Sequence, residues 1–160
     1  MNPTALLPPF FAVMRRLSKA KIKYIVIGGV AAILHGVPRA TFDLDIIIDF
    51  SSRNVKKFIK VLEEFKLVPL VPIDPNDLSD KQKRQMWIKK KNAKVINFRD
   101  LDDNYRVDVV LIYDFKKIAS IELKIEEMKI PVVDKKTLIR LKRAAGRDID
   151  LRDIKNLKEL

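Results

Sequence analysis

The stretch that decides the fold runs from residue 24 to residue 49 and reads YIVIGGVAAILHGVPRATFDLDIIID. Residues 23–29 predict a short buried strand that ends at two adjacent glycines, and residues 30–36 predict a short helix. Residues 43–50 then alternate apolar and mostly acidic side chains. This period of two predicts a strand with one face in the core and one face that carries carboxylates.

Composition limits the classes of function that the chain can have. Of its 160 residues, 48% are hydrophobic and 34% are charged, which is typical of an ordered globular protein. The absence of cysteine and the single histidine exclude disulfides, thiolate metal sites and multi-histidine zinc sites, so any metal must have oxygen ligands. The formal net charge of +12 favours an anionic partner such as nucleic acid, although a heat-stable protein could have the same charge for stability.

The length predicts a single domain over residues 1–160, with a core at about 20–133 and a helical segment at about 134–160. No apolar run reaches the roughly 20 residues of a membrane span. The apolar N-terminal stretch precedes its arginines, which is the reverse of the order in a secretory signal. We therefore expect a cytoplasmic protein without a membrane partner.

The remaining elements follow from periodicity and from turn residues. Residues 72–93 have a weak pattern that predicts a helix followed by a basic loop. Stronger patterns predict a helix at 8–19, a helix that starts after Ser51 or Ser52, a hairpin of two strands at 94–100 and 105–113, a further strand or hairpin at 120–133, and helices at 135–145 and from Asp150 onward. Together these elements predict an α+β fold, in which helices flank a central mixed or antiparallel sheet and a helix pair follows at the C-terminus.

Carboxylates on the strand at 43–50 are the first candidates for chemistry. Asp43 and Asp45 point to the same side, roughly 6–7 Å apart along the strand. Such a pair favours Mg²⁺, and a two-metal site requires a further carboxylate. Asp108 is the best candidate, because it is the one acid in the second strongly apolar strand and its burial without a partner would be costly. Asp49 lies too far along the strand, so we expect it at a strand end or cap.

An exposed edge strand with outward polar residues is the alternative explanation for Asp43 and Asp45. The glycines upstream favour the metal site. Gly28 and Gly29 end a strand and open a helix, so the backbone N–H groups of residues 29–31 are free to bind a phosphate. The alternative for the glycines is a tight turn that requires a positive φ.

Two segments, IGGVAAILHGVPRATFDLDIIID and YRVDVVLI, together resemble the polymerase beta-like nucleotidyltransferase superfamily. Its pattern is Gly-Gly or Gly-Ser, then D-x-D, then a third acid between hydrophobic residues. The fuller signature GGxAxxxHGxxRxTxDxD resembles a small prokaryotic branch that includes the type IV abortive-infection toxins. Residues 141–154, LKRAAGRDIDLRDI, are similar to a second motif of the same branch.

This resemblance implies a metal-dependent nucleotidyltransferase that moves NMP from an NTP such as ATP to a hydroxyl or phosphate acceptor on RNA, protein or a small molecule. It also implies a toxin–antitoxin context, with a toxin or antitoxin protein as partner. Two Mg²⁺ ions, or Mn²⁺, would bind to Asp43, Asp45 and Asp108. The implied catalytic residues are these three aspartates and Lys142. The implied nucleotide-binding residues are Gly28, Gly29, Val30, Arg39, Thr41, Lys142 and Asp150.

Several of these residues also have plainer explanations. Lys142 would otherwise be a solvated helix lysine, and Asp150 a helix N-cap. The basic run at 81–94 is either a solvated face or a binding surface for an RNA or tRNA acceptor. His35 and Trp87 are expected at a helix end and in the core, respectively. The alternative function for the whole chain is a non-catalytic nucleotide- or partner-binding module, such as an antitoxin-like subunit.

Overall fold

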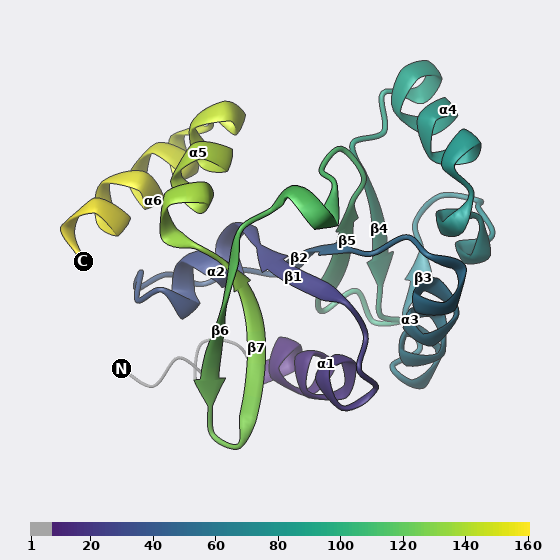
Figure 1. Cartoon of the computed structure of the whole chain (residues 1–160), viewed down its shortest axis with the longest axis horizontal. Coiled ribbons are helices and arrows are strands. Elements are labelled where there is room, and N and C mark those ends of the chain that lie inside the picture. Colours follow the sequence, from purple (N-terminus) through teal and green to yellow (C-terminus); the bar gives the residue numbers. More distant parts are fainter. Residues whose placement is uncertain (1–7) are drawn as a thin grey trace.

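A mixed sheet of seven strands organises the chain in the computed structural model, which describes residues 8–160 (Figure 1). The strands are β1 (Tyr24–Ile27), β2 (Asp43–Ile48), β3 (Val68–Pro69), β4 (Val95–Arg99), β5 (Arg106–Val110), β6 (Ser120–Ile125) and β7 (Met128–Val133). Their order across the sheet is β3-β4-β5-β2-β1-β7-β6. The strand that carries Asp43 and Asp45 therefore lies at the centre of the sheet and not at its edge.

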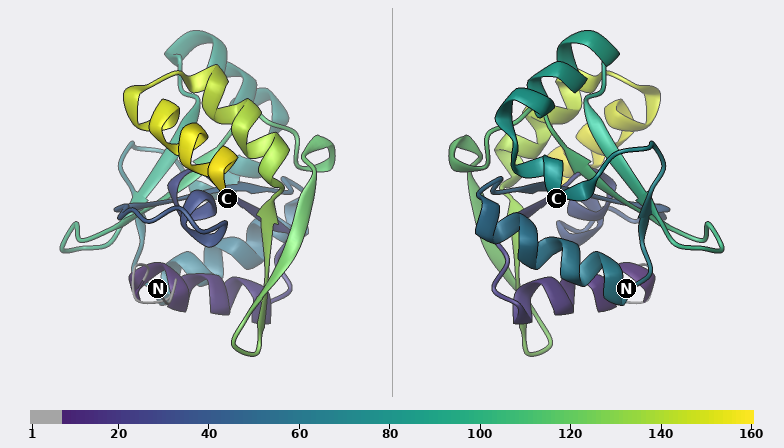
Figure 2. Two further views of the ribbon diagram at one scale, coloured as in Figure 1. Left: turned by 90° about the vertical axis from the view of Figure 1, so that its left-hand side faces the viewer. Right: turned by 90° about the vertical axis from the view of Figure 1, so that its right-hand side faces the viewer.

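Helices lie on both sides of this sheet. They are α1 (Pro8–Lys19), α2 (Gly28–Leu34), α3 (Ser52–Glu64), α4 (Lys81–Lys91), α5 (Lys135–Ala145) and α6 (Asp148–Glu159), with short 3₁₀ turns η2 (Pro75–Ser79) and η3 (Phe115–Lys117). In both views of Figure 2, α1 and α3 lie on one side of the sheet, and α5 and α6 lie on the other. These elements confirm the predicted α+β fold with its C-terminal helix pair.

The register of the central strands sets one row of residues across the sheet. Strand β2 runs antiparallel to β1, with Asp45 opposite Ile27, and parallel to β5, with Asp45 opposite Asp108. Strand β4 runs antiparallel to β5, with Asn97 opposite Asp108. Residues directly opposite one another point to the same face of a sheet. Ile27, Asp45, Asp108 and Asn97 therefore share one face.

The opposite face of the same strands is apolar and forms the core. Leu44, Val107 and Phe98 occupy the next row, and none of them is exposed. The Phe98 ring packs edge to face against Phe58 of α3, with a centroid distance of 6.2 Å. Because side chains alternate along a strand, burial of this row turns Asp45 and Asp108 toward the side of α5 and α6.

Two boundaries differ from the predictions. The basic run is helical and not a loop, because the Asp80 carboxylate caps the start of α4 by accepting the N–H groups of Gln82 and Lys83. The last helix begins at Asp148, so Asp150 is not its N-cap. Asp150 occupies the third helical position, where its Oδ2 accepts the Arg147 N–H at 3.1 Å.

Membrane association by a spanning helix was not expected. No helix among residues 8–160 combines the length and the apolarity that a membrane span requires. Residues 5–7 of the apolar N-terminal stretch lie outside the described residues.

Candidate active site

A cavity of about 450 Å³ lies between the acidic face of the sheet and the C-terminal helices. Of the residues predicted for the site, it is lined by Gly28, Gly29, Arg39, Thr41, Asp43, Asp45, Asp108, Lys142 and Asp150. Val30 is the exception, because its side chain is fully buried and only its backbone could serve a ligand. The structure thus brings together residues that are widely separated in the sequence. We call this space the site cavity.

Asp43, Asp45 and Asp108 form an acidic cluster at the centre of the site cavity. Burial, together with the charges of Asp108 and Asp43, raises the pKa of Asp45 to about 7. Burial also raises the pKa of Asp108, although the hydrogen bond that Asn97 Nδ2 donates to Asp108 Oδ1 at 2.8 Å opposes this shift. The cluster therefore resists full ionisation in the absence of a cation.

A divalent cation would relieve this repulsion, and an all-carboxylate cluster suits Mg²⁺. Among residues 8–160, no group of three His, Cys, Asp or Glu side chains is already arranged closely enough to hold a metal ion. The three carboxylates would therefore have to turn toward a common point to bind one ion together. Their ligand chemistry fits a magnesium site, and their side-chain positions would need to adjust.

The glycine turn lies directly beside the acidic cluster. Gly28 has φ +68°, and a Cβ atom at this position would overlap Oδ2 of Asp45. At Gly29, a Cβ atom would lie 3.1 Å from Thr41 Oγ1 and 3.3 Å from Arg39 Cζ. Glycine is therefore required at position 28 for two reasons, the positive φ and the close approach of the Asp45 carboxylate. Ile27 precedes α2 and provides no side-chain cap, so no side chain caps the first turn.

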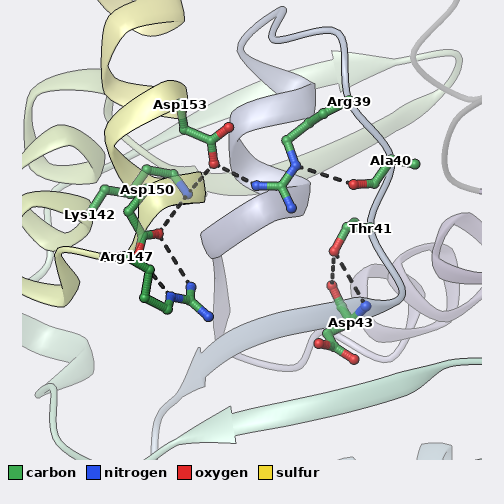
Figure 3. A network of polar contacts seen from close by, with 8 residues as sticks. All are labelled: Arg39, Ala40, Thr41, Asp43, Lys142, Arg147, Asp150 and Asp153. Atoms are coloured by element: carbon green, nitrogen blue, oxygen red, sulfur yellow. Dashed lines mark hydrogen bonds and ion pairs between the residues drawn. The ribbon is translucent and has the colours of Figure 1, made fainter.

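A network of ion pairs, in which Lys142, Asp150 and Asp153 are buried and Arg147 is exposed, closes the other side of the site cavity (Figure 3). Lys142 Nζ lies 2.8 Å from Asp153 Oδ2 and 3.7 Å from Asp150 Oδ1. Arg39 donates to the same Oδ2 of Asp153, and Arg147 Nε donates to Asp150 Oδ2 at 2.8 Å. The alternative of a solvated lysine is wrong, because Lys142 is only 4% exposed.

Sequence reasoning missed three residues that contact the predicted ones. Asn97 carried a signal, because it is the only polar side chain between apolar residues at 95–98 and lies on a strand next to that of Asp108. Arg147 and Asp153 lie within the C-terminal motif, but the sequence does not identify their partners. Lys94 and Tyr113 also line the site cavity. Lys94 belongs to the basic run at 81–94, whereas Tyr113 had no distinguishing signal.

Three further residues lie where the sequence placed them, outside this cavity. His35 ends α2, and its Nε2 lies 2.8 Å from the Val133 carbonyl oxygen. Trp87 is 4% exposed and belongs to the core. Asp49 follows β2, and its Oδ1 accepts the Ser51 N–H at 2.9 Å. These structural interpretations are confirmed.

The fold and the sequence place this protein among the nucleotidyltransferases. The chain belongs to a family described as nucleotidyltransferase of unknown function (DUF6036), whose model matches residues 9–158. No curated protein matches the chain significantly.

Solved structures show the same fold. The chain is similar to the lincosamide antibiotic adenylyltransferase LnuA, bound to lincomycin, with a TM-score of 0.67, 19% identity, and coverage of 95% of this chain and 96% of that one. It is also similar to a putative nucleotidyltransferase from Thermotoga maritima, with a TM-score of 0.59, 18% identity, and coverage of 100% of this chain and 97% of that one. Similarity to the antibiotic-resistance factor ANT(2'')-Ia has a TM-score of 0.61, 10% identity, and coverage of 99% of this chain and 83% of that one. Identities this low show a shared fold.

Proposed function

We propose that this chain is a metal-dependent enzyme that transfers NMP from an NTP to a hydroxyl or phosphate acceptor on RNA, protein or a small molecule. Membership of a nucleotidyltransferase family supports nucleotidyl transfer in general. The observation that carries the proposal further is the register of β2 and β5. It sets Asp45 directly opposite Asp108, beside a glycine turn that has no room for a larger side chain.

In this proposal, Asp43, Asp45 and Asp108 hold two divalent ions, Mg²⁺ or alternatively Mn²⁺. Such ions would supply neutralisation of phosphate charge and activation of the attacking hydroxyl. The raised pKa of Asp45 supports the proposal, because repulsion among these carboxylates disappears when a cation binds between them. Asn97 orients Asp108 through its hydrogen bond and favours the ionised form of that carboxyl, which is the form that binds a cation.

The nucleotide phosphates would lie between the glycine turn and the buried ion pairs. Backbone N–H groups of Gly29 and Val30 face the phosphates, and Gly28 allows their close approach. Lys142 and Arg39 supply positive charge, while Asp150 holds Lys142 and Thr41 braces the start of β2. Arg39, Lys142 and Arg147 thus place three cations on the side of the site cavity that faces the acidic cluster, where they could contact the phosphates.

The acceptor is open to more than one class. The similar fold of a lincosamide adenylyltransferase supports a small-molecule acceptor, and the basic run at 81–94 supports RNA or tRNA. A toxin–antitoxin role, with a protein partner, rests on the sequence resemblance. The non-catalytic alternative is disfavoured, because a binding module would not need the acidic cluster together with the glycine turn.

Label transfer tests the proposal. The intact protein is incubated with each α-labelled NTP, Mg²⁺, tRNA and cell extract, and products are separated by size. We expect label on an acceptor with the native chain and none with Asp45→Ala. Glu122→Ala is the matched control, because it removes an exposed carboxylate on the edge strand β6 and should leave transfer unchanged. Transfer that survives Asp45→Ala, or no transfer with any NTP, would overturn the proposal.

A further inference from the structure

A second cavity, of about 640 Å³, adjoins the site cavity at Tyr113, which lines both. Its walls are the residues that follow β2, the segment 111–116, and one face of α4. Residues 81, 84, 85 and 88 of α4 line it, and this spacing places them on a single side of the helix. The basic segment thus contributes to the wall of a cavity next to the site.

In-line transfer of the nucleotidyl group would place the acceptor on the side of the site cavity that adjoins the second cavity. Gly28 directly follows β1, whereas Lys94 directly precedes β4 and Tyr113 follows β5. Strand β2, with Asp43 and Asp45, lies between β1 and β5. Figure 1 shows the same separation, with α5 and α6 to the left of the central strands and α4 to the right. Attacking and leaving oxygens lie roughly in line across the reacting phosphorus. With pyrophosphate near Gly28 and Lys142, the acceptor approaches from the Tyr113 side.

The lining of the second cavity combines aromatic rings with cations. Phe50, Tyr113 and Phe115 contribute the rings, and the guanidinium of Arg84 lies 4.3 Å from the centre of the Phe50 ring. Lys81, Arg84 and Lys116 contribute positive charge. Among residues 8–160, no ion pair joins Lys81, Lys94 or Lys116 to a carboxylate, so these ammonium groups have no protein counter-charge in contact.

Two carboxylates also line this cavity, and each accepts a hydrogen bond from a backbone N–H group. Asp49 Oδ1 accepts the Ser51 N–H at 2.9 Å, and Asp114 Oδ1 accepts the Lys116 N–H at 3.0 Å. Their hydrogen bonds stabilise the two turns that shape the cavity wall. The lining therefore has three cations, Lys81, Arg84 and Lys116, against these two carboxylates, and its aromatic rings lie beside ammonium groups that are not in ion pairs with any described residue.

We propose that the second cavity binds the end of a single-stranded nucleic acid whose hydroxyl is the acceptor. This inference rests on the proposed function. Rings that stack on bases, beside cations that contact phosphates, are the usual elements of single-strand binding. In the transfer, the hydroxyl oxygen bonds to the α-phosphorus and its proton passes to water. The bond between the α and β phosphates breaks, and pyrophosphate leaves with the electron pair.

Binding of short single-stranded oligonucleotides tests this assignment. Fluorescence anisotropy measures the Kd of a labelled RNA, and of a DNA of the same sequence, with the full chain and no NTP. Lys81→Gln/Lys116→Gln should raise the Kd about tenfold, and Phe115→Leu should raise it severalfold through lost stacking. The matched control is Lys19→Gln/Lys129→Gln, which removes two lysines from a different cavity, between α1 and the β6–β7 hairpin. This control should change the Kd less than about twofold.

An equal loss of affinity in both lysine pairs would overturn the assignment, because it would indicate a diffuse effect of net charge. Binding of RNA or DNA that Lys81→Gln/Lys116→Gln and Phe115→Leu leave unchanged would also overturn it, whereas a loss of affinity confined to these variants would support it. Label transfer to protein or small molecules, without oligonucleotide binding, would overturn this inference alone. Oligonucleotide binding without any label transfer would overturn the transferase and the acceptor role together.

Discussion

Lys142 and Asp153 form a buried ion pair, with Nζ 2.8 Å from Oδ2, and Arg39 donates to the same oxygen. One carboxylate therefore joins α5, α6 and the loop before β2. Removing one partner from a buried pair leaves an uncompensated charge. We expect Asp153→Ala to lower the free energy of unfolding by about 3–5 kcal/mol, measured by urea denaturation.

The control for this prediction is an exposed ion pair. Arg16 Nε lies 2.8 Å from Glu64 Oε2, and these side chains are 41% and 44% exposed. Surface pairs contribute about 0–1 kcal/mol, so Glu64→Ala should have little effect. Similar losses of unfolding free energy in the two variants would mean that burial does not strengthen the contribution of the Asp153 ion pair to stability.

Gly28→Ala should disrupt the acidic cluster. The new Cβ would overlap the Asp45 carboxylate, and a positive φ costs alanine about 1–2 kcal/mol. Gly146→Ala separates these two causes, because Gly146 has φ +66° but its nearest atom to a Cβ is 3.6 Å away. We expect both variants to lose stability in urea, and only Gly28→Ala to lose NMP transfer almost completely. Equal activity in the two variants would contradict the role of close approach.

The pH dependence of stability should report on Asp45. Its pKa in the folded protein is raised to about 7, so the stabilisation that it contributes is present at low pH and is lost as pH rises through 7. The melting temperature of the metal-free protein should therefore fall between about pH 4, near the pKa of an unfolded aspartate, and about pH 7, and level off above that. Asp134, whose pKa is lowered by its hydrogen bond with Thr137, titrates below this window.

Two comparisons check the origin of this trend. Asp45→Asn should flatten the fall in melting temperature, because the titrating group is gone. Mg²⁺ should raise the melting temperature of the native chain more at about pH 8 than at about pH 5, since metal ligands must be deprotonated. A fall in melting temperature that Asp45→Asn leaves unchanged would assign the titration to another group.

Asn97→Ala should weaken metal binding without removing a ligand. The Asn97 amide donates to Asp108 Oδ1 and holds down the pKa of that carboxyl. Loss of such a supporting hydrogen bond typically lowers metal affinity about 10–100-fold. Calorimetric titration with Mg²⁺ measures the change. Asn104→Ala is the control, because Asn104 Nδ2 donates to a half-buried aspartate, Asp100, outside the site cavity. Unchanged affinity in Asn97→Ala would remove Asn97 from the site.

Much of the fold could be predicted because its elements have strong local patterns. Leu44 and Ile46 are fully buried and alternate with the half-buried Asp43 and Asp45, whereas Ile47 is as buried as its neighbours and departs from the alternation. The weak pattern at 72–93 has a physical reason, since α4 buries only Trp87 and so has little amphipathic character. Strand β3 has two residues, which is too short for a period of two to appear.

The site was less predictable where it depends on distant contacts. Asp108 could be identified because an acid in an apolar strand requires a partner. The partner of Lys142 could not be identified, because Asp150 and Asp153 lie three residues apart on one helix and both reach the same lysine. The sequence could not show that Gly29 lines the site cavity while Val30 does not, since a glycine turn does not reveal which of its residues face a cavity.

The parallel pairing of β2 with β5 also affects how the chain folds. The crossover that joins β2 to β5 contains α3, β3, α4 and β4, so Asp45 and Asp108 are far apart in the sequence and meet only when the two strands pair. Contacts between residues far apart in sequence carry a high loop-closure cost and form slowly. A chain in which β2 and β5 have not paired therefore has no assembled acidic cluster, and we expect it to lack the chemistry proposed for this site.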